Sequence, residues 1–321
     1  MGRRSIWSKP EIIELTKNFV TATDEVWRLQ NGQDGDCRLF QSFADQGHYR
    51  NHQSTRQGIY VVTARGKLLG SLNTHNTEAV AKMLQEAVAQ YPNLPEAERK
   101  LPAESDITAK HRWELSYQAD GLDLTMFARD LPTDGQPTSE SRAAWNEDRI
   151  WFSLDEVKQM FPQDQLEVGQ SWPLPEKLAN RFARFNIIDT VKGQTTPYGP
   201  EHIQNATIEF KLLQQDQEQI KVQITGSTKA EADKSRGQDM PHGIETQLLG
   251  MATYDRTAQR FTEFEMVAAG QRWGRTVFNG RRRHLKASPV GFVFRLTPAD
   301  APLIAPAFLY SYNTDWVIFQ R

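Results

Sequence analysis

The single cysteine of the chain, Cys37, is its clearest candidate nucleophile. It stands at the start of a predicted helix, where exposed backbone N–H groups and the helix dipole would stabilise a thiolate. Asp34 and Asp36 oppose this effect, because nearby carboxylates repel a second negative charge. The sequence therefore leaves two interpretations of Cys37. It is either a catalytic thiol, redox or peroxidatic, or a small half-buried residue without chemistry of its own.

Three histidines supply the bases that a catalytic thiol would need, and they also raise the question of a metal site. His48 and His52 are four residues apart and would share one face of a helix, to which Cys37 or His75 could add a ligand. Gly47 and the polar residues around His52 are more typical of a loop. The prediction is therefore scattered surface histidines and no bound metal.

The segment that follows a predicted strand near position 270 is basic and aromatic. It contains the densest group of candidate functional residues in the chain. Its arginines could hold a carboxylate or phosphate bidentately, while its aromatic rings offer stacking surface. The alternative is a solvated loop whose arginines pair with Glu263 and Glu265 on the adjacent strand. The candidate ligand-binding residues are Arg272, Trp273, Arg275, Asn279, Arg281, Arg282 and Arg283.

Composition narrows the classes of partner and cofactor. The chain has 321 residues and a formal net charge of −2, so neither nucleic acid nor a membrane is the default partner. One cysteine permits no intrachain disulfide. No apolar run approaches the roughly 20 residues that span a bilayer, and no apolar stretch follows the basic N-terminus as in a signal peptide. Walker, dinucleotide, Gly-x-Ser-x-Gly and His-Glu-x-x-His patterns are absent. We expect a cytoplasmic protein without a cofactor, although a removed signal would leave no trace.

The elements of the first third are organised around a predicted hairpin and helix. Ile59–Thr63 and Lys67–Leu72 are short strand-like runs joined by a turn at Arg65-Gly66. From Asn76 or Thr77 the period becomes helical, with Val80, Leu84, Ala87 and Tyr91 on one face.

Upstream of the hairpin, the pattern predicts a helix, a strand and a second helix. The first helix runs over Pro10–Val20, with Ser8 as N-cap and Glu11 completing a capping box. Phe19–Trp27 is apolar and β-branched enough for a strand, and Cys37–Ala44 is a short helix that Asp36 would cap.

This order of elements resembles the thioredoxin-like fold over about the first 90 residues. In that family the first helix begins at a Cys-x-x-Cys pair, whereas this chain has Ser5-Ile6-Trp7-Ser8. A cis-proline precedes a later strand in the family, whereas Arg56–Tyr60 contains no proline. The resemblance implies the scaffold and, with both redox hallmarks missing, a loss of the family's thiol–disulfide activity.

The rest of the chain predicts an antiparallel β-rich module after a linker. The expected domains are a thioredoxin-like module at 1–92, a Pro-rich linker at 93–107 and the β-rich module at 108–321, which makes an α+β protein. The β-rich module would be a sandwich or a partly open barrel with short flanking helices at Ser153–Phe161 and Glu176–Phe185. Its predicted strands are Trp113–Tyr117, Leu122–Ala128, Ala206–Leu213, Ile220–Thr225, Ile244–Tyr254, Phe261–Ala268 and Val290–Leu296.

Two stretches of the β-rich module, Leu248–Asp255 and Gly270–Gly274, are similar to uncharacterised bacterial proteins, a resemblance that implies no function. The preferred interpretation of the whole chain is a non-catalytic binding or assembly protein with an anionic small molecule or a protein as partner. The alternative is a thiol-dependent oxidoreductase or peroxidatic enzyme that uses Cys37. The sequence specifies no oligomeric state.

Overall fold

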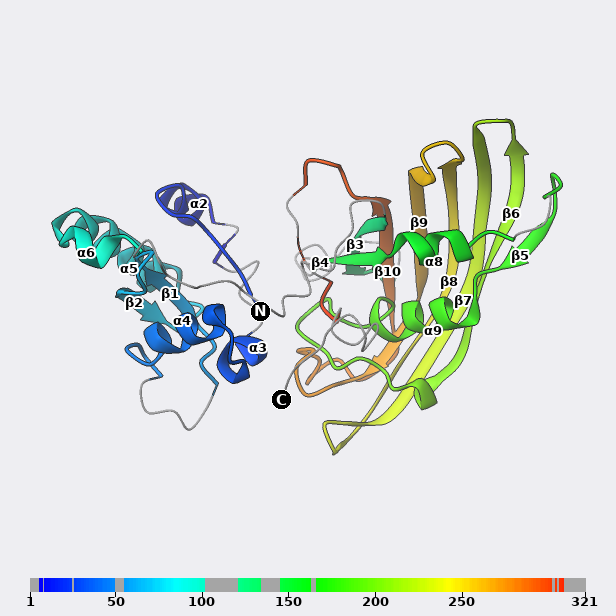
Figure 1. The fold of residues 1–321 in the computed structure, drawn as a ribbon. Coiled ribbons are helices and arrows are strands. Elements are labelled where there is room, and N and C mark those ends of the chain that lie inside the picture. The colour runs from blue at the N-terminus through cyan, green and yellow to red at the C-terminus, as the bar shows by residue number, and fades with distance from the viewer. Residues whose placement is uncertain are drawn as a thin grey trace. The chain divides into compact units, whose positions relative to one another are not determined.

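The computed structural model describes residues 6–7, 9–24, 26–49, 55–101, 121–133, 145–162, 166–301, 304 and 306–308. The chain divides into two compact units, Met1–Arg112 with Val317–Arg321 and Trp113–Trp316 (Figure 1). The predicted linker at 93–107 begins in the first unit, where its described residues include a short helix, Glu96–Arg99. Residues 102–107 of that linker lie outside the described residues.

The described regular elements of the first unit are helices and one hairpin. Its described elements are α2 (Pro10–Thr16), α3 (Val26–Asn31), α4 (Gly35–Ala44), β1 (Ile59–Val62), β2 (Leu68–Leu72), α5 (Thr77–Gln90), the 3₁₀ turn η1 (Tyr91–Asn93) and α6 (Glu96–Arg99).

The predicted hairpin and the helix that follows it are confirmed. Strands β1 and β2 pair antiparallel, and Gly66 has the positive φ of +85° that their turn requires. The Asn76 side chain caps α5 by accepting a hydrogen bond from the Ala79 N–H at 3.0 Å. Tyr91 is 43 % exposed and is not part of the buried face, because the chain leaves the α-helix there.

Upstream of the hairpin, three sequence predictions are wrong. The expected strand Phe19–Trp27 does not form: residues 20–24 have no regular structure, Val20 is fully exposed, and α3 begins at Val26. Helix α2 ends at Thr16 and has Lys9, without a side-chain cap, at its N-cap position. Helix α4 is capped by Asp34, which lies two residues before the expected cap.

The first unit contains a two-stranded sheet within its described residues. The thioredoxin-like arrangement needs further strands beside this hairpin, and Phe19–Trp27 was one of those expected. The thioredoxin-like fold of the first unit therefore stays a prediction. Ser5 and Ser8 lie outside the described residues.

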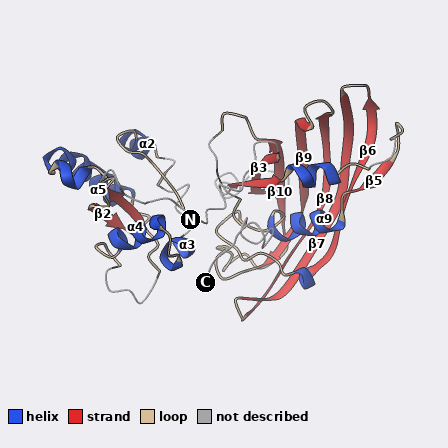
Figure 2. Ribbon diagram, in the orientation of Figure 1, coloured by secondary structure: helices blue, strands red, loops and turns tan. Residues whose placement is uncertain are grey.

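The second unit is built on one antiparallel sheet, with helices across one face (Figure 2). Its described elements are β3 (Leu122–Asp130), β4 (Trp145–Phe152), α8 (Leu154–Gln159), β5 (Ser171–Pro173), α9 (Glu176–Phe185), η3 (Pro200–His202), β6 (Ile203–Gln215), β7 (Gln219–Ser235), β8 (Gln238–Asp255), β9 (Arg260–Gly274) and β10 (Ser288–Leu296).

The eight described strands are arranged in the order β4-β3-β10-β9-β8-β7-β6-β5. Strands β5 to β10 form a meander of neighbours, and β3 joins its far edge by pairing with β10. The predicted meander is confirmed, but its strands are longer than predicted. Strands β4 and β5 were not predicted. The predicted strand Trp113–Tyr117 lies outside the described residues.

The core of the second unit lies between one face of this sheet and the helices α8 and α9. Along β8 the buried Ile244, Leu248 and Ala252 alternate with the exposed Gln247 and Leu249, as the twofold period of a strand requires. Both predicted helices are present, and α8 carries the full capping box of Ser153 and Glu156. The described strands of the second unit form one sheet, and not the two facing sheets of the predicted sandwich.

Candidate functional site

The basic segment predicted from the sequence forms a loop, residues 275–287, between β9 and β10. Gly274 begins this loop at a φ of +69°, and a side chain there would collide with the Pro241 carbonyl. The loop packs against the chain that follows α9. A Cβ on Gly193 would overlap the Phe278 carbonyl, and one on Gly280 would meet the Lys192 carbonyl. We refer to residues 275–287 as the β9–β10 loop.

Arg281 ties this loop to two other parts of the unit. Its guanidinium donates to Asp189 (Nε–Oδ2 2.8 Å, Nη2–Oδ1 2.7 Å) and to Asp130 (Nη1–Oδ2 2.8 Å, Nη2–Oδ1 2.6 Å). The Arg281 side chain is only 1 % exposed. Burial alone would raise the pKa of Asp130. The hydrogen bonds and charge of Arg281 outweigh burial, and the pKa of Asp130 is lowered. Arg281 is thus held by two carboxylates distant in sequence.

Arg272 lies beside this pair and is completely buried. It donates through Nη1 to the His284 carbonyl at 2.6 Å and through Nη2 to the Gly274 carbonyl. Its Nε is 3.2 Å from Asp189 Oδ2. Burial lowers the pKa of Arg272, and Asp189 opposes that shift. Arg272 therefore holds the later part of the loop, at His284, to the end of β9.

Asn279 organises the tip of the loop through reciprocal bonds with Thr276. The Thr276 N–H donates to Asn279 Oδ1 at 3.1 Å, and the Asn279 N–H donates to Thr276 Oγ1 at 3.2 Å. Asn279 Nδ2 also lies 3.3 Å from Asp189 Oδ2. Three of the predicted ligand-binding residues, Arg272, Asn279 and Arg281, thus make buried contacts within the unit.

The other basic side chains of the loop point to solvent. Arg282, Arg283 and Lys286 are exposed and Arg275 is half-buried, and none of the four forms an ion pair with a described residue. Arg236, in the β7–β8 turn, lies 5.0 Å from the ring of the exposed Phe278. We call these cations the basic patch, and its members are Arg236, Arg275, Arg282, Arg283 and Lys286.

The structure differs from the alternative in which the arginines pair with glutamates of β9. In the described residues, Glu263 accepts a hydrogen bond from Thr253 at 2.8 Å and Glu265 pairs with Arg295 at 3.4 Å. Trp273 lies on the sheet face opposite the core, where its ring covers Gly243. The structure brings Arg272, Asn279 and Arg281 together but separates them from Arg282 and Arg283.

Sequence reasoning missed four residues of this network. Asp130 and Asp189 follow ordinary apolar stretches, with no motif to mark them as partners of Arg281. Tyr198 and His242 lie beside Arg272 and stack at 5.3 Å between ring centroids. Burial raises the pKa of Tyr198 and lowers the pKa of His242.

Cys37 lies inside the first unit and is 1 % exposed. Arg28 Nη1 lies 3.3 Å from the sulfur, and the Arg28 carbonyl lies 3.6 Å from it. Burial raises the pKa of Cys37 to about 12, the contact with Asp34 adds to this, and the charge of Arg28 opposes it. At neutral pH the sulfur is therefore a protonated thiol, which does not favour nucleophilic chemistry.

The candidate metal ligands do not converge within the described residues. His48 stacks on Tyr60 at 5.2 Å and its Nε2 is 3.3 Å from the Gln57 carbonyl. His75 is exposed, and His52 lies outside the described residues. A search of the described part of the chain finds no cluster of three or more metal-binding side chains.

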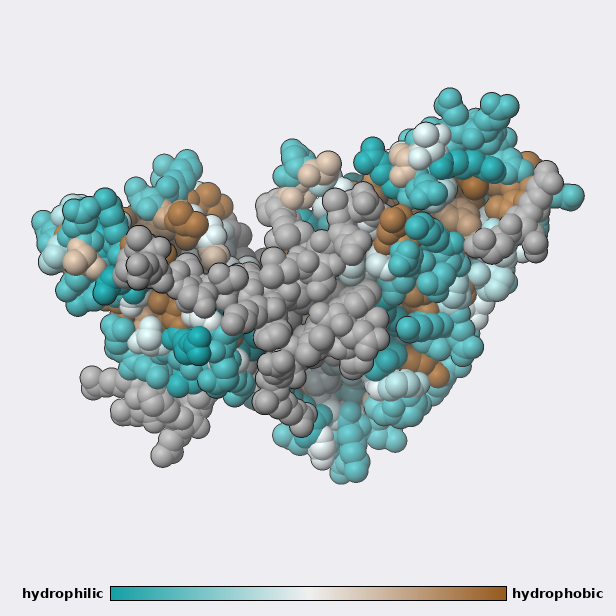
Figure 3. Space-filling model, in the orientation of Figure 1, coloured by the Kyte–Doolittle hydropathy of each residue, from teal (hydrophilic) through white to brown (hydrophobic). Residues whose placement is uncertain are grey.

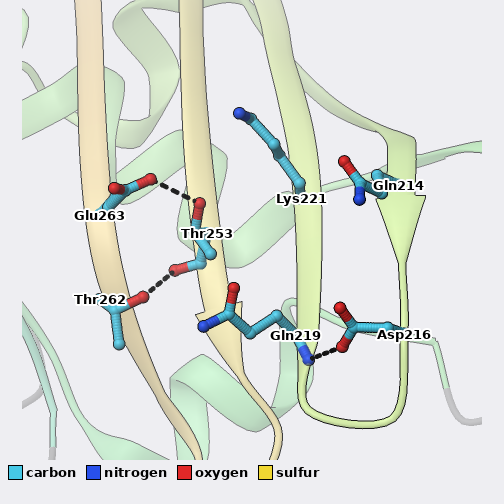
Figure 4. A pocket seen from close by; sticks show the side chains of 7 residues that line it. All are labelled: Gln214, Asp216, Gln219, Lys221, Thr253, Thr262 and Glu263. Carbon is cyan, nitrogen blue, oxygen red and sulfur yellow. Dashed lines mark hydrogen bonds between the residues drawn. The ribbon is translucent and has the colours of Figure 1, made fainter.

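A shallow hollow of about 230 Å³ on the second unit is lined by polar residues at the ends of β6–β9 (Figure 4). Its acidic groups already have partners. Glu263 accepts from the Thr253 hydroxyl, and Asp216 Oδ1 accepts from the Gln219 N–H at 2.7 Å. The hollow has no apolar wall that could bury a ligand, so it carries no candidate chemistry.

Within the described residues, no helix combines the length and the apolar character that crossing a bilayer requires. Comparison of the chain with protein-family models, with curated proteins and with solved structures finds no match.

Proposed function

We propose that this chain is a non-catalytic binding or assembly protein whose second unit binds an acidic protein partner through the basic patch. The observation that carries the proposal is the contrast between buried and exposed arginines at the end of β9 and in the β9–β10 loop. Arg272 and Arg281 hold the loop in place, whereas Arg282 and Arg283 are exposed and Arg275 is half-buried. These last three have no acidic partner in the described residues.

An anchored loop favours binding because little conformational entropy remains to be lost when a partner arrives. Arginine side chains can bind carboxylates bidentately, and Phe278 adds an exposed apolar surface beside them. The formal net charge of −2 argues against nucleic acid as the partner, because the basic surface is local. An acidic segment of a protein fits such a local basic surface better than a nucleic acid does.

The first unit is included in this proposal as a thioredoxin-like scaffold that has lost its redox function. Serines at the family's cysteine spacing and the hairpin followed by α5 support it. The burial of the lone cysteine is consistent with a role in packing.

The proposal is tested by measuring the affinity of the full-length protein for a fluorescein-labelled glutamate decamer by fluorescence anisotropy. We expect saturable binding that weakens as salt rises from 50 to 300 mM, because exposed charges are screened (a Debye length of about 10 Å at 0.1 M). The double variant Arg282→Gln/Arg283→Gln should weaken binding about tenfold or more.

The matched control removes two positive charges elsewhere on the same unit. Lys177→Gln/Lys211→Gln changes two exposed lysines that have no ion pair among the described residues, and it should leave the affinity unchanged. Equal losses in both double variants would show attraction to net charge alone and would contradict the proposal. Absence of saturable binding by the wild-type protein would contradict it as well.

A further inference from the structure

A larger cavity lies at the opposite end of α8 from β4, between that helix and the ends of β6, β7 and β8. Its volume is about 790 Å³, within the range of roughly 300–1,000 Å³ that is typical of small-molecule sites. Figure 3 shows hydrophobic surface in this part of the unit, above α8. We call it the α8 cavity. Its lining residues are Lys158, Phe161, Pro162, Leu166, Gln215, Asp216, Gln217, Ile220, Tyr254 and Arg256.

The apolar wall of the α8 cavity is continuous with an aromatic cluster of the core. Phe161 lies 4.4 Å from Tyr254 and 5.8 Å from Phe261 between ring centroids. Leu166 and Ile220 complete the wall, and each is less than 9 % exposed. Because Leu166 and Ile220 are already buried, the gain would come from covering the half-buried Phe161 and Pro162 and the apolar part of the ligand, at about 25 cal/mol per Å² of surface removed from water.

Two cations from different parts of the chain, Lys158 and Arg256, are among the residues that line the α8 cavity. Arg256 is oriented by Gln215, whose Oε1 accepts from Nη2 at 2.5 Å, and by its own N–H, which donates to the Glu218 carbonyl at 2.7 Å. Lys158 is 3.7 Å from Asp155, a contact between exposed groups that contributes little.

Among the described residues that line the α8 cavity, Asp216 is the one that is acidic. Its Oδ1 accepts the Glu218 N–H at 2.8 Å and the Gln219 N–H at 2.7 Å in the β6–β7 turn. These bonds, with a smaller contribution from the charge of Arg256, lower the pKa of Asp216. The described part of the lining therefore has one more positive than negative charge beside an apolar wall.

We propose that the α8 cavity binds an amphipathic monocarboxylate, with its apolar body against Phe161, Ile220 and Tyr254 and its carboxylate on Arg256 and Lys158. The class of ligand follows from the pairing of surfaces: an apolar wall selects a hydrocarbon or aromatic body, and the two cations in the lining select an anionic head. This inference is independent of the basic patch, which lies on other elements of the unit.

The test uses octanoate and its uncharged analogue 1-octanol, titrated into the full-length protein by isothermal calorimetry. We expect octanoate to bind about tenfold more tightly than 1-octanol, because only octanoate has a charge for the two cations of the lining. Arg256→Gln should weaken octanoate binding about tenfold and leave 1-octanol binding unchanged. Lys177→Gln on the neighbouring helix α9 is the matched control and should change neither.

The position of the bound octanoate is checked by NMR with ¹³C-methyl-labelled isoleucine. The Ile220 methyl signal, assigned through Ile220→Val, should shift on addition of octanoate. The Ile224 signal should not shift, because that side chain is fully buried four residues further along the same strand. Equal affinities for octanoate and 1-octanol, shifts at Ile224 without Ile220, or no saturable octanoate binding would each overturn the proposal.

Discussion

Arg281 and Arg282 are adjacent in sequence and identical in chemistry, yet they occupy opposite environments. Arg281 is 2 % exposed and engaged by two carboxylates, whereas Arg282 lies in solvent. The surroundings of Cys37 likewise determine its chemistry. Desolvation favours the neutral thiol over the thiolate, and the charge of Arg28 recovers only part of that loss.

The raised pKa of Cys37, about 12, predicts slow alkylation of the native protein. The rate with iodoacetamide should keep rising with pH through pH 9 without reaching a plateau, because the thiolate fraction is still small there. In denaturant the same cysteine should titrate near 8.5. A native plateau with a midpoint below pH 8 would restore the interpretation of Cys37 as a reactive thiol.

At the scale of elements, the β9–β10 loop shows how an irregular segment is held by groups outside it. Asp130 ends β3, Asp189 follows α9, and both meet at Arg281. The loop's shape therefore depends on contacts between residues about 90 and 150 positions apart. Helices α5 and α8, by contrast, are capped by residues at their own N-termini.

Arg281→Ala should lower the free energy of unfolding of the second unit by about 3–5 kcal/mol, because it leaves the buried Asp189 and the partly buried Asp130 without their main partner. The measurement is urea unfolding, together with hydrogen exchange of the amides in 275–287, which should lose protection. Arg282→Ala should stay within about 0.5 kcal/mol of wild type. Similar destabilisation in the two variants would rule out the anchoring role of Arg281.

At the scale of the whole molecule, the second unit combines one large sheet with a buried set of charges at one end. The pKa of Asp130 is lowered, because the bonds from Arg281 and the charges of Lys192 and Arg272 outweigh its burial. A lowered folded-state pKa contributes stability that is present above the unfolded value of about 3.9 and is lost as the pH falls through the folded value.

We therefore expect the second unit to lose stability below about pH 4, and expect part of that loss to come from Asp130. Asp130→Asn should be less stable than wild type at pH 7 and should lose less additional stability between pH 5 and pH 2. The readout is urea unfolding at each pH, with the exposed Asp239→Asn as the control for removing one carboxylate. An unchanged dependence on pH in Asp130→Asn would contradict this account.

The sequence by itself determined the elements whose signals are local. The turn at Gly66, the Asn76 cap, the capping box of Ser153 and the alternation along β6–β10 each depend on neighbours within a few residues, so pattern and structure agree. It failed at Phe19–Trp27, where β propensity had no sheet to join in the described residues, because a strand is stabilised by its partners rather than by its own backbone.

Only the tertiary structure decided which arginines of the basic segment are buried and which are exposed. The sequence identified Arg272–Arg283 as one candidate surface. Folding brought Asp130 and Asp189 to Arg281 and placed carbonyl oxygens on Arg272, and it left Arg282 and Arg283 in solvent. It also assembled the α8 cavity from α8, β6, β7 and β8. Ion pairs and cavities join residues that are distant in the chain, and no local pattern encodes which of them will meet.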